Sequence, residues 1–309
     1  MHGTQSPIAA PCTHCGANTP SKRLEGARGA VLTCGACGGR YLADWGQSYS
    51  EALYDYYGDP EWLALASAYD PLTEQRYVAL LDAFARRVPG RSVLDVGCGV
   101  GHFVHTASQR GWNARGIELS SAAVNFCQSH GVPVTQTDLF SAELEANSWD
   151  VCTLFEVLEH LPEPQAFLAR TVELTRPGGL VYVTVPNIAS LDARVQGRDW
   201  TAINPEHLSY FTPQTLGRLL RGAGLKPLDM TSRNVSGMTL RKLVGRSAPP
   251  PALETASVAE ALAPYHADQR LRARIEGSPV LRAAKATVNG VLGAFGLGSA
   301  LVALSVKPT

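Results

Sequence analysis

The stretch that decides the fold is VLDVGCGVG, residues 93–101. Its opening residues are apolar apart from Asp95, which is typical of a strand in a parallel sheet that is covered on both faces. The glycines that follow allow the backbone to turn sharply and to approach a ligand closely, because they carry no Cβ. A second apolar segment ends at Glu118, whose carboxylate can accept hydrogen bonds from both hydroxyls of a ribose. Together these two features predict a site for a nucleoside cofactor.

The spacing of the glycines distinguishes two kinds of nucleoside site. A dinucleotide site has the pattern G-x-G-x-x-G and places a pyrophosphate on a helix N-terminus. Residues 97–101 instead read G-x-G-x-G, and Asp95 stands two residues before the first glycine. This arrangement resembles motif I of the class I S-adenosylmethionine (SAM)-dependent methyltransferases. In that family the acidic residue and the glycine backbone hold the methionine end of the cofactor, so the resemblance implies SAM.

Further segments follow in the order of the same family. Apolar stretches at 132–135, 149–155, 180–185, 225–230 and 300–306 are expected to be strands, and they alternate with helical stretches. This alternation predicts a doubly wound α/β fold with a parallel sheet. The resemblance covers about residues 70 to 235 and implies a Rossmann-like, seven-stranded sheet. The residues that it implies for cofactor binding are Asp95, Gly97, Gly99, Gly101, Glu118, Asp138 and Phe155.

Two Cys-x-x-Cys pairs stand near the N-terminus, Cys12 with Cys15 and Cys34 with Cys37. Each pair suits a tight turn that presents two thiolates to one tetrahedral ion, so the spacing predicts a closed, structural zinc site in a small ribbon. Disulfides or a redox pair are the alternatives, and the lack of a secretion signal in the first residues favours zinc.

Three units are expected along the chain. They are a zinc-ribbon module at 1–45, a helical lid or linker at 46–90, and a methyltransferase core at 91–309 with a helical insertion at about 235–296. The aromatic residues at 49–69 either cover the cofactor and substrate or anchor the ribbon on the core, and the sequence leaves both open. The stretch 286–306 carries no charged side chain, but its glycines favour a helix followed by the last strand over a membrane span.

A second candidate site contains Glu156, Glu159 and His160. If this segment is helical, their spacing places them on one face, next to the cofactor cleft at the end of a strand. His207 supplies a further ligand downstream, and such a set suits Mg²⁺ or Mn²⁺. The pattern E-x-x-E-H with a later histidine resembles the metal site of small-RNA 2′-O-methyltransferases and ubiquinone-pathway O-methyltransferases. There it implies a metal that holds substrate hydroxyls beside the methyl sulfonium.

Two readings without a metal remain for the same residues. Glu159 and His160 can simply pack and hydrogen-bond the next loop. Alternatively His160 or His207 is the general base, because the ordinary pKa of histidine lies near neutrality. The catalytic candidates are therefore His160, His207 and Glu156.

The charge balance and one absent motif narrow the chemical class of the methyl acceptor. The 27 basic and 27 acidic residues balance, so no broad electrostatic footprint for nucleic acid is visible. The motif Asn/Asp-Pro-Pro-aromatic, typical of amino-adenine methylation, is replaced by FEVL at 155–158. We therefore expect a cytoplasmic enzyme that methylates a hydroxyl of a small molecule, glycan or lipid precursor, without stable membrane insertion.

Three alternatives stay open. One is an RNA methyltransferase whose ribbon binds phosphates through Lys22, Arg23, Arg28 and Arg40. Another is a sugar C-methyltransferase, because such enzymes also combine a zinc-binding unit with this core. The third is a non-catalytic protein that only binds the cofactor. The sequence determines neither the acceptor nor the oligomeric state.

Overall fold

The computed structural model describes residues 10–45, 63, 71–243, 274–275 and 277–309. The aromatic residues expected in the lid at 49–69, and residues 244–273 of the expected insertion, lie outside the described residues. The division into three units therefore stays a prediction.

The main sheet has seven strands in the order β10-β11-β8-β7-β4-β5-β6. Their bounds are β4 (Ser92–Val96), β5 (Asn113–Glu118), β6 (Val134–Gln136), β7 (Trp149–Phe155), β8 (Thr175–Pro186), β10 (Lys226–Arg233) and β11 (Ala300–Val306). The neighbours from β6 to β8 pair in parallel, whereas β11 is antiparallel to both β8 and β10. The predicted seven-stranded, Rossmann-like sheet is confirmed, with its last strand at the predicted position.

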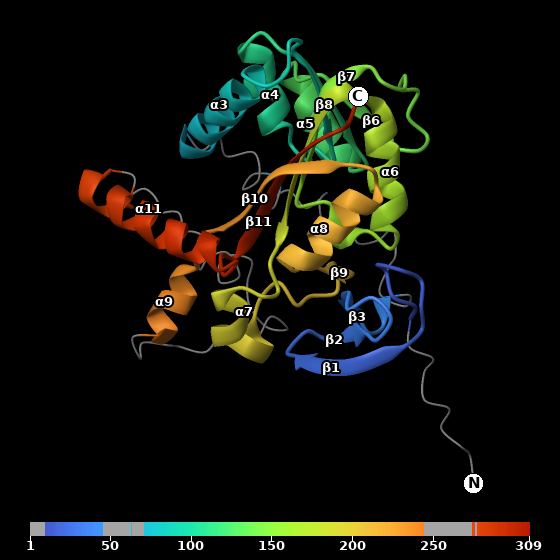
Figure 1. Cartoon of the computed structure of the whole chain (residues 1–309). Helices are drawn as coiled ribbons and strands as arrows, with labels where there is room; N and C mark the ends of the chain where they lie inside the picture. Colours follow the sequence, from blue (N-terminus) through green and yellow to red (C-terminus); the bar gives the residue numbers. More distant parts are fainter. Residues whose placement is uncertain (1–9, 46–62, 64–70, 244–273, 276) are drawn as a thin grey trace.

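Helices cover both faces of this sheet (Figure 1). Along β4 the side chains alternate, so that Val93 joins one apolar cluster and Leu94 joins the other. The Val93 cluster includes α3 (Pro71–Ala85), α4 (His102–Gln109) and α5 (Ser121–Ser129), and the Leu94 cluster includes α6 (Pro164–Leu174) and α8 (Pro213–Gly222). This arrangement is the doubly wound fold that the alternation of strands and helices predicts.

A local sequence signal determines where α8 begins. Thr212 Oγ1 accepts from the Thr215 amide at 3.2 Å, and Pro213 opens α8, as expected of a threonine cap followed by proline. Near the C-terminus α11 (Pro279–Ala294) ends before β11. No helix in the described part of the chain is long and apolar enough to cross a membrane.

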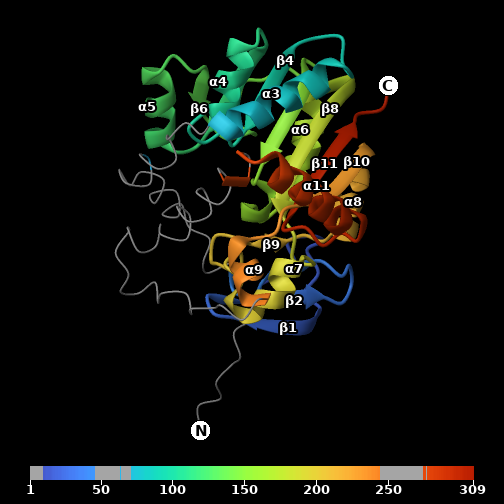
Figure 2. The ribbon, with the colours of Figure 1, turned by 90° about the vertical axis from the view of Figure 1, so that its left-hand side faces the viewer.

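A second, four-stranded sheet contains the ribbon. It has the order β1-β2-β3-β9, from β1 (Pro20–Gly26), β2 (Gly29–Cys34), β3 (Arg40–Leu42) and β9 (Ser209–Tyr210). Because β9 comes from the segment just before α8, far from the ribbon in the sequence, the ribbon is not a separate sheet of its own. Figures 1 and 2 both show the blue ribbon beside β9 and α7 (Leu191–Gln196).

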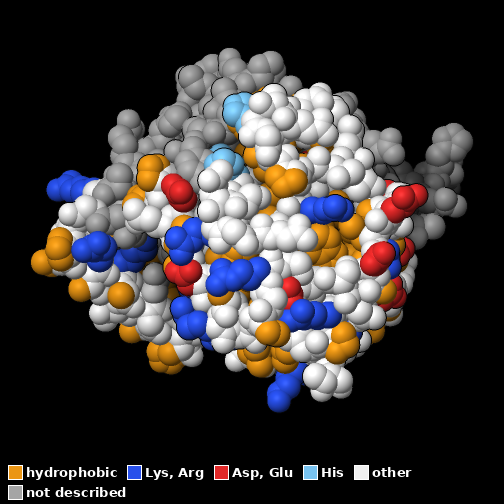
Figure 3. Space-filling view, turned by 90° about the horizontal axis from the view of Figure 1, so that it is seen from above, with side chains coloured by type: hydrophobic (Ala, Val, Ile, Leu, Met, Phe, Trp, Pro, Cys, Tyr) orange, Lys and Arg blue, Asp and Glu red, His pale blue; other side chains and the backbone are white. Residues whose placement is uncertain are grey.

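The surface carries charges of both signs. On the face shown in Figure 3, basic and acidic side chains of the described residues are interspersed. This pattern agrees with the balanced composition of the chain.

Candidate active site

A cavity of about 270 Å³ opens at the carboxyl ends of β4, β5 and β7. In open parallel sheets this edge is the usual place for a ligand. The predicted site residues that line it are Gly97, Gly99, Glu118, Asp138, Phe155, Glu156 and His160. The cavity therefore joins most of the predicted cofactor residues to part of the second candidate site.

Glu118 is fixed by backbone amides. Its Oε2 accepts from the Gly99 amide at 2.8 Å, which ties the end of β5 to the glycine-rich turn. Its Oε1 accepts from the amides of Leu119 at 2.8 Å and Ser120 at 2.9 Å. These three bonds leave about one of the four lone-pair sites of the carboxylate, on Oε2, to accept a hydrogen bond from a ribose hydroxyl.

Asp95 lies below the turn and is 2% exposed. Thr153 Oγ1 donates to its Oδ1 at 2.7 Å. Burial raises the pKa of Asp95 to about 7, and the nearby charge of Glu118 acts in the same direction. A cationic ligand in the cavity would favour the ionised form of this carboxyl group.

Glycine is required at positions 99 and 101 for two different structural reasons. A Cβ at Gly99 (φ 54°) would meet no atom within 4 Å, so this position borders open space where a ligand fits. A Cβ at Gly101 (φ 72°) would lie 2.9 Å from Cys127 Sγ and from Val132 Cγ1, so that glycine permits close packing of the turn.

The far wall of the cavity comes from the loops after β5 and β6. Asp138 Oδ1 accepts from the amides of Phe140 at 2.8 Å and Ser141 at 2.9 Å. Hydrogen bonds from Ser141 and Phe140 lower the pKa of Asp138. Leu119, which is 42% exposed, and Leu139, which is buried, add apolar surface of the kind that suits a nucleobase.

The segment of Glu156, Glu159 and His160 is not an α-helix, so the condition under which the three side chains would share one helix face is not met. Glu156 has φ 54°, outside the helical region, and only a single 3₁₀ turn, η2 (Leu158–His160), follows it. Glu159 and His160 nevertheless meet His207, since one potential ligand atom of each lies within 4.8 Å of the others. Glu156 does not belong to this group, but it lines the adjoining cavity.

The cluster of Glu159, His160 and His207 leaves polar atoms without partners. Both carboxylate oxygens of Glu159 and Nδ1 of His207 are buried and have no hydrogen-bond partner among the described residues. The rings of His160 and His207 lie 4.8 Å apart at 85°, and His160 Nδ1 lies 3.0 Å from the Glu206 carbonyl oxygen. Buried polar atoms without partners are uncommon in proteins and point to a missing ligand.

Burial sets the charge of this cluster. It lowers the pKa of His207 to about 3 and also lowers the pKa of His160, so both rings are neutral at pH 7. It raises the pKa of Glu159 well above the ordinary value, and the carboxylate of Glu156 acts in the same direction. Neutral imidazoles offer lone pairs either to a metal ion or to a proton.

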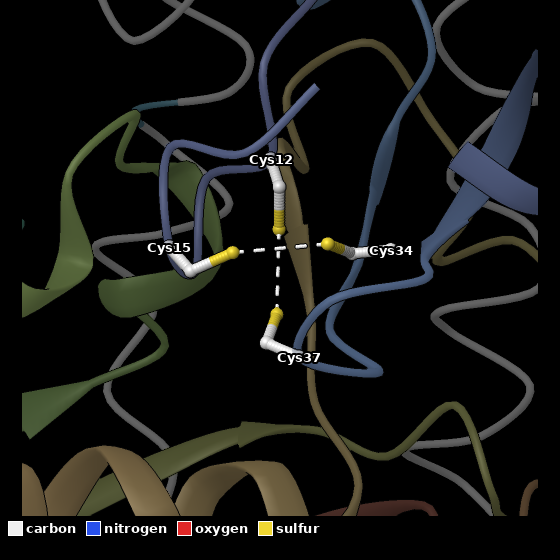
Figure 4. Close-up of side chains that lie close together, drawn as sticks. All are labelled: Cys12, Cys15, Cys34 and Cys37. Carbon is white, nitrogen blue, oxygen red and sulfur yellow. Dashed lines mark hydrogen bonds between the residues drawn. The ribbon is translucent and has the colours of Figure 1, made fainter. Parts of the chain in front are cut away.

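The four cysteines of the ribbon converge on one point (Figure 4). The sulfurs of Cys12 and Cys37 are 3.7 Å apart, as are those of Cys15 and Cys34. Sulfurs at about 2.3 Å from a tetrahedrally bound zinc would lie about 3.8 Å from one another. The observed spacing fits a closed Zn²⁺ site.

Comparison with known proteins identifies the family. A sequence model described as a methyltransferase domain matches residues 71–229, just over half of the chain. The chain belongs to this methyltransferase family. The ubiquinone biosynthesis O-methyltransferase of Cupriavidus pinatubonensis is 32% identical over 198 residues, covering 59% of this chain and 77% of the relative. These matches make the chain a SAM-dependent methyltransferase enzyme and favour none of the alternatives to O-methylation that the sequence left open.

Solved structures agree on the fold. The plantazolicin methyltransferase BpumL in complex with SAH has a TM-score of 0.52 at 16% identity, covering 84% of this methyltransferase and 95% of that chain. A SAM dependent methyltransferase from Archaeoglobus fulgidus has a TM-score of 0.50 at 17% identity, covering 76% of this chain and 94% of that chain. At these identities the similarity shows the fold alone.

Some residues of the methyltransferase site were not predicted. Leu119, Val157 and Glu206 all line the cavity. Leu119 directly follows the acidic residue at the end of β5, and Glu206 directly precedes His207, so adjacency to a predicted residue was the available signal. Four residues that were predicted for the cofactor site or the second site do not line the cavity: Asp95, Gly101, Glu159 and His207.

Proposed function

We propose that this methyltransferase transfers the methyl group of SAM to a hydroxyl oxygen of a small-molecule, glycan or lipid-precursor acceptor. The observation that carries the proposal is that one cavity is lined both by Gly99 and Glu118 and by Glu156 and His160. An acceptor beside His160 would thus lie next to the cofactor. The similarity to an enzyme named as a biosynthetic O-methyltransferase supports an oxygen acceptor.

The cofactor roles follow the walls of the cavity. Glu118 would accept from the ribose hydroxyls, and Asp138 with Leu139 would contact the adenine. The backbone of Gly97 and Gly99 would hold the methionine end, and Phe155 would close the inner wall. Asp95 and Gly101 do not line the cavity and would support the glycine-rich turn from behind. Three amides already fix the Glu118 carboxylate, which supports its role because an ordered side chain loses little entropy on binding.

The reaction requires alignment and removal of a proton. The methyl group of a sulfonium is already activated, so the main task of the protein is to place the acceptor oxygen in line with the S–CH₃ bond. A hydroxyl must also lose its proton. Where no metal is bound, His160 is the residue that can accept it, since it lines the cavity and its lowered pKa keeps it neutral at pH 7. Glu206 orients this ring through its carbonyl oxygen.

We also propose a divalent cation, Mg²⁺ or Mn²⁺, on Glu159, His160 and His207, with Glu156 at its edge. The unpartnered oxygens of Glu159 and the unpartnered Nδ1 of His207 support this site, because a cation would satisfy them. When bound, such an ion would favour the deprotonated form of an acceptor hydroxyl. His160 as a base without a metal is the alternative for the same residues.

Zn²⁺ on Cys12, Cys15, Cys34 and Cys37 is proposed as a structural ion. Four thiolates leave no open coordination position, so this site would take no part in the chemistry. Cysteine pairs that bind zinc and do not form disulfides suit a reducing compartment, which supports the proposal of a cytoplasmic enzyme.

The test is to offer purified protein and methyl-labelled SAM to separate small-molecule, lipid, RNA and protein extracts. We expect label in the small-molecule or lipid extract. NMR of the labelled product should show that its methyl group is attached to oxygen. His160→Ala should lower the rate at least 100-fold, whereas His130→Ala, at the exposed C-cap of α5, should not. Label confined to RNA or protein would overturn the proposed acceptor class.

A further inference from the structure

We infer that the cysteine ribbon is a positioning element of the active site, which holds the loop that carries Glu206 and His207 beside the cofactor cavity. The inference rests on the proposed function, since it concerns the same site. It predicts that loss of the ion from the ribbon disturbs the acceptor side of the site and spares the cofactor side.

The first link is a backbone connection through Leu208. The Leu42 amide of the ribbon donates to the Leu208 carbonyl oxygen at 2.9 Å, and the Leu208 amide donates to the Glu159 carbonyl oxygen at 2.7 Å. Leu208 follows His207 directly, so the position of that histidine is set between the ribbon and the turn that carries Glu159. The pairing of β3 with β9 continues this connection at Tyr41 and Ser209.

The second link joins the first cysteine knuckle to β9. Thr13, between Cys12 and Cys15, accepts at Oγ1 from Ser209 Oγ at 2.7 Å, and both side chains are buried. The next residue, His14, accepts at its carbonyl oxygen from Gln165 Nε2 at 2.8 Å, and its ring contacts Phe211 with centroids 5.1 Å apart. This knuckle therefore contacts Ser209, the first residue of β9, and Phe211, which directly follows β9.

The third link lies at the other end of the ribbon. The Ala27 amide, in the turn between β1 and β2, donates to the Arg198 carbonyl oxygen at 2.7 Å. A Cβ at Gly26 would lie 2.5 Å from Ile203 Cγ2, so this turn packs closely on the loop after α7. Ribbon and loop also share one apolar cluster, which includes Val31, Leu42, Trp200, Ile203, Leu208 and Tyr210.

The ribbon has little else to keep its shape. Its own cluster of buried residues is Cys12, Leu32, Cys34 and Tyr41, so two of the four members are cysteines of the proposed zinc site. A module of this size usually needs a metal to fold. In contrast, Glu118 accepts from the amides of Gly99, Leu119 and Ser120, none of which belongs to the ribbon.

The first test removes the ion from the full chain. We expect Cys12→Ser with Cys15→Ser to bind no zinc, while the affinity for SAM stays within threefold of wild type. Hydrogen exchange at residues 205–211 should rise at least tenfold, exchange at 97–99 should not change, and acceptor turnover should fall at least tenfold. Exchange needs no acceptor, so this readout stays informative even if the proposed function fails.

The second test leaves the cysteines intact. Thr13→Val removes the acceptor for Ser209 and should raise exchange at 205–211 about threefold, with zinc still bound. Thr33→Val in the same ribbon, on β2 away from β9, is the matched control and should change neither quantity. Unchanged exchange at 205–211 in both Thr13→Val and the zinc-free protein would overturn the inference. It would also be overturned if the zinc-free protein lost SAM affinity by as large a factor as acceptor turnover.

Discussion

The amide of Gly99 donates to Glu118 Oε2 at 2.8 Å, which locks the glycine-rich turn to the end of β5. Two further amides, of Leu119 and Ser120, bind Oε1 of the same carboxylate. One acidic side chain thereby organises two walls of the cavity before any ligand arrives. Its removal should affect binding of the cofactor more than any other single change on these walls.

Glu118→Ala is expected to weaken SAM binding about 10- to 100-fold by isothermal titration calorimetry. Hydrogen bonds to a charged partner contribute about 1.5–3 kcal/mol, and the variant loses the acceptor for the ribose. Glu143→Ala, an exposed acid after β6, is the matched control and should bind SAM as wild type does. An affinity of Glu118→Ala within threefold of wild type would contradict the ribose role.

Asp95→Asn should make the stability of the protein less dependent on pH. Burial raises the pKa of Asp95 from 3.8 to about 7, so the folded state keeps this proton to a higher pH than the unfolded chain does. The resulting stabilisation is complete below the unfolded pKa and is lost as pH rises through about 7. The wild type should therefore lose about 2–3 kcal/mol more than the variant between pH 5 and 8.

Urea unfolding at both pH values measures this difference. Asp229→Asn, on the exposed part of β10, controls for removal of one negative charge. Parallel pH profiles for wild type and Asp95→Asn would show that Asp95 ionises in the folded state as it does in the unfolded chain.

The sequence predicted the main sheet because its signals are local. Residues 149–155 are apolar except for Asp150 and Thr153, and they form the buried strand β7. Likewise, Thr212 and Pro213 mark the start of α8 through a cap that involves only the next turn. Such features depend on neighbours in the chain, so the residue pattern is sufficient to predict them.

For the second candidate site, the sequence named the three residues that meet, Glu159, His160 and His207, but not their geometry. The spacing of Glu156, Glu159 and His160 fits one helix face, yet Glu156 is left-handed and only a 3₁₀ turn follows it. The contact with His207 lies next to β9, whose pairing with the ribbon joins residues far apart in the sequence. A two-residue strand has no apolar periodicity, so this pairing left no local signal.

Gly99→Ala and Gly101→Ala should affect different properties. Both positions have a positive φ, where a Cβ costs about 1–2 kcal/mol. At Gly101 the Cβ also meets Cys127 and Val132, which adds about 1–3 kcal/mol of overpacking. At Gly99 the Cβ points into open space beside the cavity, where it would meet the cofactor.

We expect Gly101→Ala to lower the free energy of unfolding more than Gly99→Ala does. Gly99→Ala should weaken SAM binding at least tenfold under conditions where both variants are folded. Denaturant unfolding and calorimetric titration measure the two quantities separately. If Gly99→Ala bound SAM as tightly as wild type, the cofactor would not lie against Gly99. A smaller loss of stability in Gly101→Ala than in Gly99→Ala would contradict the close packing at Gly101.

Added Mn²⁺ should raise the thermal midpoint of the wild type, because a ligand that binds only the folded state stabilises it. At a concentration of 100 times Kd the gain in the free energy of unfolding is about 2.7 kcal/mol.

Glu159→Gln should abolish this effect, since Glu159 is the carboxylate of the cluster that contains His160 and His207. The same variant should be more stable than wild type at pH 7 without metal, because burial raises the pKa of Glu159, so that folding must protonate this side chain, whereas Gln is already neutral. Glu143→Gln, on the surface, should respond to Mn²⁺ as wild type does. If neither Mn²⁺ nor Mg²⁺ moves the wild-type midpoint, the cluster holds no such cation, and His160 must remove the acceptor proton unaided.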